Sequence, residues 1–461
     1  MSPHPRRWWA LLVLAAAQFM VIMDTSIIGV ALPEMQLDLG FSPGDLQWVF
    51  NAYVVAFGGL LLLGGRLSDL FGPRRVFTTG WLILIAGSVV AAAAGTASIE
   101  IVGRAVQGVG GALIAPAAMT LLMLLFGGNP RELGKAMALY GAAAPAGGTA
   151  GVFLGGVITE YLSWPWVFIV YIPIGLATLA AIGLLPAVEG KRGGLDALGA
   201  ISVTAGLALI VYAIVSADGI SAAAGVVLLA VFLAAQRMVR EPLMPLAIWR
   251  VPGLAVSNLA MGLLGAAWIP MWYFLNLYLQ QVLGYGAFAG GAALLPMTVA
   301  IMIFMVGITA RLMGRFGAKA LIVSGLAVLA AGIAGLALVR PAGSFATDVL
   351  PASLVAAVGM SLAYIPAMMS AMSGARPEES GLASGIVNTT YNVGSALGLA
   401  VMTAIATAQG ATELGNVVEL TDGFHAAFIG AGVVALLGAI LSLVLMRKPT
   451  PSPVEPAPAR V

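Results

Sequence analysis

The stretch "GRLSDLFGPR", residues 65–74, returns later in the chain as "ARLMGRFGAK", residues 310–319. Each copy joins two long apolar segments, and the second copy begins 245 residues after the first. A membrane span needs about 20 apolar residues, and six candidate spans end near residue 186. The offset therefore leaves roughly 60 residues beyond one block of six spans, which is room for two more. We expect six spans, two inserted spans and six further spans.

The composition is that of a polytopic membrane protein. Of the 461 residues, 61% are hydrophobic and 9% are charged, and the mean hydropathy is +1.02. A soluble domain carries about 25% charged residues. The apolar runs predict fourteen spans, at residues 9–33, 46–65, 76–95, 101–125, 134–159, 164–186, 196–216, 221–239, 252–281, 288–313, 318–339, 348–373, 381–408 and 423–446.

The basic residues fix the expected orientation. With the N-terminus in the cytoplasm, 19 of the 21 Lys and Arg residues fall in cytoplasmic loops or termini. Only Arg340 falls in an external loop, and Arg104 falls within a span. Cytoplasmic loops of membrane proteins carry such an excess of Lys and Arg. We therefore expect a multi-pass protein of the cell membrane with both termini in the cytoplasm.

These observations predict an all-α membrane protein made of two six-helix bundles and two inserted central helices. The N-terminal bundle is expected at residues 1–187, the inserted helices with their linkers at 188–250, and the C-terminal bundle at 251–446. The Pro-rich end, residues 447–461, is expected to be a disordered cytoplasmic tail. Parallel repeats around a central site are a transporter architecture.

Several classes of function are disfavoured. The chain has no cysteine and two histidines, which excludes disulfides and thiolate sites and argues against a histidine metal site. We find no catalytic His/Asp/Glu cluster, no nucleophile–base pair and no Gly-rich phosphate loop, so neither an enzyme nor an ATP-driven pump is indicated. No cofactor is expected, and a net charge of +2 gives no reason for a nucleic-acid partner. A channel fits the composition, but the two-block repeat disfavours it.

Five motifs, in order, resemble those of the major facilitator superfamily, in its fourteen-helix drug:proton antiporter branch. They are "MDTSIIGVALP" (23–33), "GGRLSDLFGPRR" (64–75), "IVGRAVQGVGGALIAP" (101–116), "YLQQVLGYGAFAGGAALLP" (278–296) and "GLASGIVNTTYNVGSALGLAV" (381–401). The fifth-helix motif departs from the usual pattern, since "GVFLGG" has Val152 where the branch usually has proline. The resemblance implies alternating-access export of lipophilic small molecules, coupled to protons.

Asp24 is the acidic residue that we expect well inside a predicted span, and Arg104 is the basic one. Ionisable groups within a membrane usually face a cavity and often serve function. We therefore predict that Asp24 carries the coupling proton, with Arg104 as its partner. The alternatives are a structural ion pair between the two residues and an aspartate held neutral by hydrogen bonds.

The loop motif at 65–75 is the candidate gate. Gly65 and Gly72 permit unusual backbone angles and close approach, and Asp69 can pair with Arg74 or Arg75. The resemblance favours an ionic latch between the two halves, whereas the simpler reading is an ordinary basic loop. The second copy has Gly314 in place of Asp69, so the latch is expected in one half only.

Aromatic and amide side chains are the candidates for substrate binding. Trp268, Trp272 and Asn276 are four residues apart and share one helix face, which suits a cavity for flat lipophilic molecules. The alternative is the aromatic belt at the membrane surface. The same prediction covers Asn51, Tyr53, Gln107, Asn388 and Asn392.

The sequence thus predicts a proton-coupled exporter of lipophilic compounds, of the drug or antibiotic efflux type. Its expected partners are a small-molecule substrate, protons and the lipid bilayer. Export of a lipid or an endogenous metabolite, or facilitated transport without proton coupling, remain the alternatives.

Overall fold

In a computed structural model, the described residues are 6–190, 194, 196–372, 380–412 and 415–446. Within these residues every regular element is a helix. The N-terminal part has α1 (Arg7–Leu39), α2 (Trp48–Phe71), α3 (Pro73–Ala92), α4 (Ala97–Phe126), α5 (Pro130–Tyr161), α6 (Trp166–Ile169), α7 (Tyr171–Ala180) and η1 (Ala181–Leu184). The middle has α8 (Ala197–Ser216), α9 (Gly219–Met238) and η2 (Leu246–Arg250). The C-terminal part has α10 (Leu254–Leu277), η3 (Tyr278–Val282), α11 (Ala287–Ile303), η4 (Phe304–Ile308), α12 (Thr309–Leu336), η5 (Phe345–Val349), α13 (Leu350–Met372), α14 (Ser380–Ala408) and α15 (Val417–Leu445).

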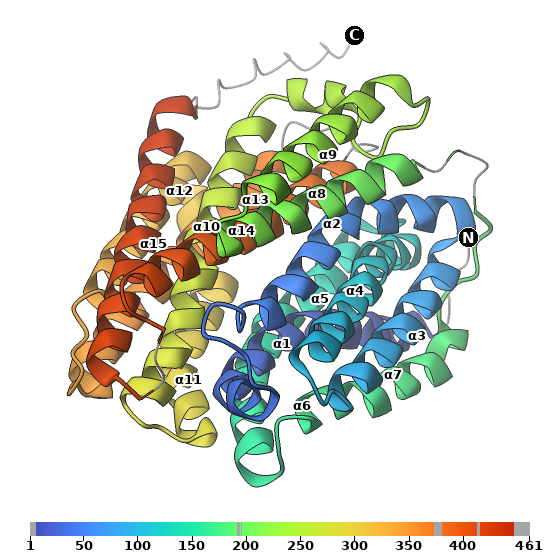
Figure 1. Ribbon diagram of the computed structural model, residues 1–461. Coiled ribbons are helices and arrows are strands. Elements are labelled where there is room, and N and C mark those ends of the chain that lie inside the picture. Colours follow the sequence, from blue (N-terminus) through green and yellow to red (C-terminus); the bar gives the residue numbers. More distant parts are fainter. Residues whose placement is uncertain (1–5, 191–193, 195, 373–379, 413–414, 447–461) are drawn as a thin grey trace.

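Within the described residues, thirteen helical stretches are long and apolar enough to cross a membrane, among them Trp166–Leu184, which α6, α7 and η1 form together. A fourteenth, α11, is a shorter apolar helix that η4 extends, in agreement with the fourteen spans that the apolar runs predicted. The predicted fold class is confirmed. We call the end of the bundle at which α1 begins the proximal end, and the end at which α1 finishes the distal end. Successive spans run in alternate directions between them (Figure 1).

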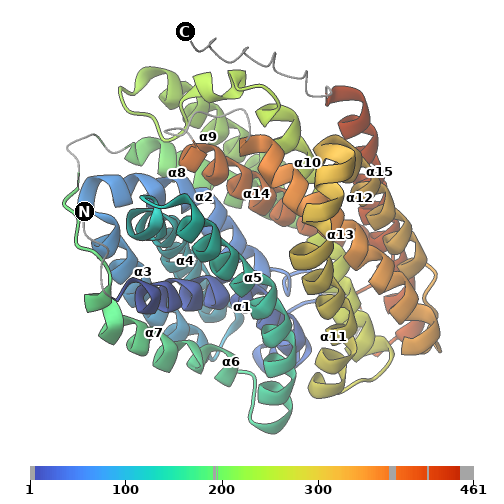
Figure 2. The same cartoon turned by 180° about the vertical axis from the view of Figure 1, so that it is seen from behind.

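The two halves repeat the same packing. In the N-terminal half, α1 packs against α5, α3 against α4 and α2 against α4. The equivalent pairs in the C-terminal half are α10 with α14, α12 with α13 and α11 with α13. The blue-to-teal helices of the first half and the yellow-to-red helices of the second lie beside each other in both views (Figures 1 and 2).

The repeated loop motif has the same backbone geometry in both copies. Gly72 ends α2 with φ 88° and ψ 135°, and Gly317 breaks α12 with φ 81° and ψ 161°. The two glycines are separated by the same 245 residues as the motif itself. Their positive φ values are accessible to glycine at little cost. The motif therefore makes a sharp turn between consecutive spans at the proximal end of each half.

The inserted helices join the two halves. Helices α8 and α9 pack on each other, and α8 contacts both α2 and α14. The green helices accordingly lie over the junction of the halves in Figure 2. Asp196 caps α8, where Oδ1 accepts from the Gly199 amide at 2.7 Å and Oδ2 accepts from Gln236 Nε2 of α9 at 2.7 Å.

The glycine turns generate a prediction about stability. Gly317→Ala should lower the thermal unfolding temperature in detergent, because a side chain at this φ costs about 1–3 kcal/mol. Gly72→Ala should lower it further, because its Cβ would also lie 2.3 Å from the Val188 carbonyl oxygen. Gly314→Ala is the matched control, since no heavy atom outside its own helix and chain neighbours lies within 4 Å of the new Cβ. Equal unfolding temperatures for the variants at 314 and 317 would contradict the argument.

Candidate functional site

An ion pair lies within the N-terminal bundle. Nη1 of Arg104, on α4, lies 2.8 Å from Oδ2 and 2.9 Å from Oδ1 of Asp24, on α1. The side chains are 0% and 2% exposed, respectively. Removing a charge from water costs several kcal/mol even after the protein relaxes. Each of these charges therefore depends on the other for its place in the bundle.

The Arg104 guanidinium also binds α2 directly and is connected to α3 through Gln107 of its own helix. Its Nε donates to the Val49 carbonyl oxygen of α2 at 2.8 Å, and its Nη1 donates to Oε1 of Gln107 at 2.7 Å. Gln107 in turn donates from Nε2 to Oγ of Ser88, on α3, at 2.8 Å. One side chain thus connects α1, α2 and α4 directly, and α3 through Gln107.

Aromatic rings surround the guanidinium. Its carbon lies 4.7 Å from the centre of the Tyr53 ring and 5.8 Å from the centre of the Phe168 ring. A cation over an aromatic face gains about 2 kcal/mol or more when both are away from water. The rings keep water from the ion pair and stabilise the cation together with Asp24.

Close packing of the helices brings these groups together. A Cβ on Gly108 would lie 2.5 Å from the Tyr53 carbonyl oxygen, and one on Gly103 would lie 2.7 Å from the Ala91 nitrogen. Small residues at such positions let helix backbones approach closely. Helix α4 therefore lies near enough to α2 for Arg104 to reach a backbone oxygen there.

Glu100 is a further member of this cluster that the sequence analysis missed. The fourth span was expected from residue 101, but α4 begins at Ala97, because the Thr96 side chain accepts a hydrogen bond from the Ile99 amide. Glu100 is 0% exposed, and neither carboxyl oxygen has a hydrogen-bond partner among the residues that the structure describes. Asp24 is therefore not the only acidic side chain buried within the described spans, because Glu100 is buried as well. The signal was the spacing of Glu100, Arg104 and Gln107, which places them on one helix face.

The cluster can exchange protons and redistribute charge. It holds two carboxyl groups and one guanidinium in a buried setting. Over the described part of the chain, no group of three or more His, Cys, Asp or Glu side chains is placed to hold a metal ion. The chemistry that these residues themselves offer is acid–base chemistry.

Two predicted substrate-binding residues belong to this cluster, and a third, Asn51, lies on the same helix as Tyr53. The Tyr53 ring packs on Arg104, and Gln107 bridges Arg104 to Ser88. Asn51 is fully buried and donates from Nδ2 to Oε1 of Gln47 at 3.1 Å. In this structure their side chains contact other parts of the N-terminal half.

The face of α10 that was predicted to bind substrate lies at the contact between the two halves. Trp268, Trp272 and Asn276 are all buried. The Trp272 ring occupies the space beside Gly29 of α1, where a Cβ would lie 2.1 Å from a ring carbon. Asn276 donates from Nδ2 to the Trp272 carbonyl oxygen at 2.8 Å.

Asn388 and Asn392 lie on α14, which also contacts the other half. A Cβ on Gly58 of α2 would lie 2.8 Å from Cβ of Asn392. Nδ2 of Asn392 donates to the Asn388 carbonyl oxygen at 2.8 Å. Both side chains are half-buried. The predicted residues thus fall on two separate junctions, α1 with α10 and α2 with α14.

Four of the predicted gating residues, Asp69, Gly72, Arg74 and Arg75, lie at the proximal turn between α2 and α3, whereas Gly65 lies inside α2 and, unlike Gly72, has no positive φ. Asp69 and Arg75 are exposed, while Gly65 and Arg74 are half-buried. No ion pair joins Asp69 to Arg74 or Arg75 within the described residues.

A neighbouring arginine makes a different contact at the same turn. Arg66 pairs with Glu241, in the segment after α9, and donates from Nε to the Gly194 carbonyl oxygen at 3.1 Å. The turn therefore contacts the two segments that flank the inserted helices.

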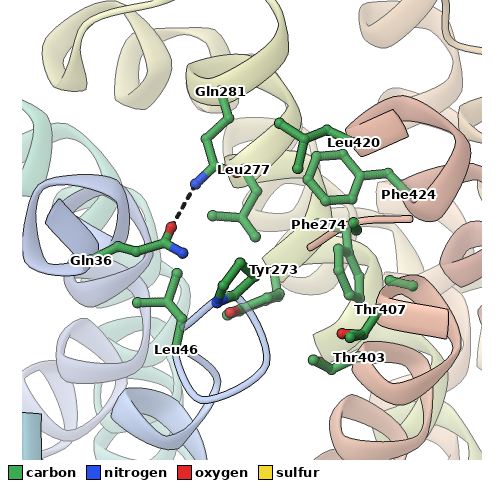
Figure 3. Close-up of a pocket in the computed structure, with 13 residues that line it drawn as sticks. Gln36, Leu46, Tyr273, Phe274, Leu277, Gln281, Thr403, Thr407, Leu420 and Phe424 are labelled. Atoms are coloured by element: carbon green, nitrogen blue, oxygen red, sulfur yellow. Dashed lines mark hydrogen bonds between the residues drawn. The ribbon is translucent and has the colours of Figure 1, made fainter. Parts of the chain in front are cut away.

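Polar contacts at the distal end join the halves, and these too were missed from the sequence. Nε2 of Gln281 donates to Oε1 of Gln36 at 2.9 Å, and Nε2 of Gln280 donates to the Val30 carbonyl oxygen at 3.1 Å. Figure 3 shows the hydrogen bond between Gln281 and Gln36, and both residues line a small pocket together with Tyr273 and Phe424. The two glutamines of α1 and η3 are 245 residues apart, and no local pattern signals such a pairing.

Two curated relatives match almost the whole chain. The cephamycin export protein CmcT of Amycolatopsis lactamdurans is 37% identical over 450 residues, which cover 95% of this chain and 92% of that protein. The puromycin resistance protein pur8 of Streptomyces alboniger is 36% identical over 480 residues, which cover 100% of this chain and 95% of that protein.

Solved structures share the fold. The nucleoside transporter NupG has a TM-score of 0.68 at 13% identity, over 94% of this chain and 99% of that chain. A bacterial homologue of the human drug peptide transporters has a TM-score of 0.64 at 17% identity, over 95% of this chain and 97% of that chain. At these identities the likeness concerns the fold alone.

The family model of the Major Facilitator Superfamily matches residues 14–399. This match and the two relatives confirm the resemblance that the five motifs indicated. With its apolar helices arranged in two repeated halves and two inserted helices between them, the chain belongs to the Major Facilitator Superfamily of multi-pass membrane transporters.

Proposed function

We propose that this protein is a proton-coupled exporter of lipophilic small molecules that works by alternating access. The observation that carries the proposal is the buried Asp24–Arg104 pair, because ionisable groups within a membrane are usually functional. The relatives support export, since one is named for cephamycin export and another for puromycin resistance. The partners of the protein are then its substrate, protons and the lipid bilayer.

Helix α1 offers a route from the proton to the contact between the halves. A proton on Asp24 removes the charge that holds Arg104. The same helix carries Gly29, which lies against Trp272 of α10, and Gln36, which binds Gln281. Asp24, Gly29 and Gln36 belong to one continuous helix, α1. A change of charge at Asp24 can therefore shift α1 and loosen its contacts with the other half.

The distribution of charged residues supports one orientation of the protein in the membrane. We infer that the proximal end faces the cytoplasm of the cell and that the chain lies in the cell membrane. The proximal turns and linkers carry the basic residues, among them Arg66, Arg74, Arg75 and Arg240, whereas the distal loops carry Arg340. In this orientation the Gln36–Gln281 contact closes the external side.

The proximal turn is proposed as the opposite gate. Asp69, Arg74 and Arg75 would form contacts with the C-terminal half when the cytoplasmic side closes, with Gly72 permitting the turn and Gly65 lying in the preceding helix. The exposure of Asp69 and Arg75 supports this proposal, because charged groups at the surface that form no ion pair with the described residues are available for a new contact.

The substrate class is inferred from the aromatic and amide groups at the junctions between the halves. Trp272 and Asn276 on α10, with Asn388 and Asn392 on α14, suit a flat lipophilic molecule that carries few polar groups. Export of a lipid or an endogenous metabolite would use the same surface. Facilitated transport without proton coupling would not need Asp24, so the following test separates it from the main proposal.

Replacement of Asp24 should abolish pH-driven transport. Asp24→Asn removes the exchangeable proton but keeps the side-chain volume, so uphill efflux in proteoliposomes under an imposed pH gradient should stop while downhill exchange of a lipophilic dye continues. Asp24→Glu should keep part of the coupling. Asp422→Asn makes the same chemical change on an exposed side chain and should transport like the wild type. Full uphill efflux by Asp24→Asn would refute the carrier role.

The orientation can be tested with single cysteines, because the chain has none of its own. Glu189→Cys lies in the exposed linker before α8, and Thr412→Cys lies in the exposed loop after α14. A membrane-impermeant maleimide added to intact cells should label position 412 and leave position 189 unlabelled until the membrane is opened. Labelling of both from the same side would refute the fourteen-span topology.

Replacement of the gate aspartate should slow transport without affecting binding. Asp69→Asn should lower the rate of efflux several-fold, because the cytoplasmic side would close less often, and the affinity for the dye should be kept. Asp45→Asn, an exposed aspartate in the loop at the distal end, is the control. An unchanged efflux rate in correctly inserted Asp69→Asn would make this turn an ordinary basic loop.

A further inference from the structure

The buried cluster has one carboxyl group more than it has cations. The ionisable side chains that influence Glu100 are Arg104 on its own helix and Asp24 on α1, and the Asp24–Arg104 pair in turn lies near Tyr53 on α2 and Tyr171 on α7. Helix α3 contributes the uncharged Ser88. With both carboxyl groups ionised, the cluster would carry a net negative charge away from water, which is costly.

The contacts show which carboxyl group uses the cation. Oδ1 of Asp24 accepts a hydrogen bond from Arg104 Nη1 at 2.9 Å, and Oδ2 lies 2.8 Å from the same nitrogen as part of the ion pair, without a hydrogen bond of its own among the described residues. Glu100 is fully buried and has no hydrogen-bond partner for either oxygen among the described residues. An ionised carboxylate in that state would lack both a hydrogen bond and water. The arrangement therefore suits an ionised Asp24 and a Glu100 that carries a proton.

Arg104 has an unused donor with which it can change partners. Its Nη2 is buried and has no hydrogen-bond partner in the described part of the chain. Glu100 precedes Arg104 by four residues on α4, so the two side chains lie on the same face, one helical turn apart. Since α4 runs from the distal to the proximal end, Glu100 lies one turn nearer to the distal end than Arg104.

We propose that Glu100 is a second proton-carrying residue, which receives the proton from the distal side and passes it to Asp24. This inference rests on the proposed proton-coupled transport. The O–H bond of Glu100 breaks, an O–H bond forms on Asp24, and the Arg104 guanidinium turns from the Asp24 carboxyl group to the new Glu100 carboxylate. The cluster holds one proton, one cation and one carboxylate before and after the step. The transfer therefore moves charge without leaving an unpaired ion in the bundle.

The decisive variant is Glu100→Gln. Glutamine resembles the protonated acid in size and hydrogen-bonding capacity, so the Asp24–Arg104 pair should remain and the protein should fold. Uphill efflux in proteoliposomes under an imposed pH gradient should fall at least tenfold, while dye binding and downhill exchange should be retained. Glu100→Asp, which keeps an exchangeable proton, should recover part of the activity with a shifted pH profile. A merely structural Glu100 predicts the opposite order, with Gln active and the shorter Asp impaired, and that result would overturn the proposal.

A measurement on the wild type keeps the proposal testable even if the variant does not fold. Infrared spectra of the purified protein near neutral pH should contain the C=O band of a buried protonated carboxyl group. Labelling with ¹³C-glutamate should shift this band, and labelling with ¹³C-aspartate should leave it in place. A shift with labelled aspartate alone, or no such band, would overturn the assignment of the proton to Glu100.

The two hypotheses fail in different ways. A wild type without any pH-driven efflux would refute the proposed function, whichever residue holds the proton. A coupled wild type with an equally coupled Glu100→Gln would leave the exporter intact and refute the role of Glu100.

Discussion

The N-terminal half is organised around one buried guanidinium. Arg104 is 0% exposed, and it binds the Asp24 carboxylate, the Val49 carbonyl oxygen and the Gln107 amide at once. Breaking a buried pair by removal of one partner costs about 3–5 kcal/mol, because the other charge stays behind in a medium that solvates it poorly. The positions of α1, α2 and α4 are therefore set by the need to satisfy this cation.

The same dependence makes the ion pair suitable for control of a conformational change. A helix bundle held together by apolar packing alone has no side chain that can be protonated or deprotonated. Here Asp24 lies in the middle of α1, and the distal part of that helix contacts the other half through Gly29 and Gln36. The contact of Gly29 with the Trp272 ring leaves no room for a side chain, so a small displacement of α1 changes the fit between the halves.

The sequence predicted the fold well because membrane spans are local features. Apolar length, basic loops and the motif copies at 65 and 310 each depend on neighbouring residues. The site was predicted less completely, because helix periodicity shows which residues share a face but not which helix that face meets. Tyr53 and Gln107 were predicted to bind substrate, and periodicity could not show that their side chains also contact Arg104. Glu100 was missed because the span boundary was drawn one residue after it, and the Thr96 cap that moves the boundary is a detail of side-chain geometry.

The two halves share a packing scheme but differ in their buried chemistry. Among the described residues, the N-terminal half buries Asp24, Glu100 and Arg104, whereas the fully buried polar side chains of the C-terminal half are uncharged, such as Asn276 and Thr403. Neutral groups of this kind do not change their charge with pH near neutrality. In our proposal the first half therefore responds to protons and the second half contributes neutral groups to recognition, and the α1–α10 junction links the two. In this proposal the fold is present in two copies, and among the described residues only one of these copies holds buried charged side chains. Protonation is then coupled to the movement of the helices at a single place in the exporter.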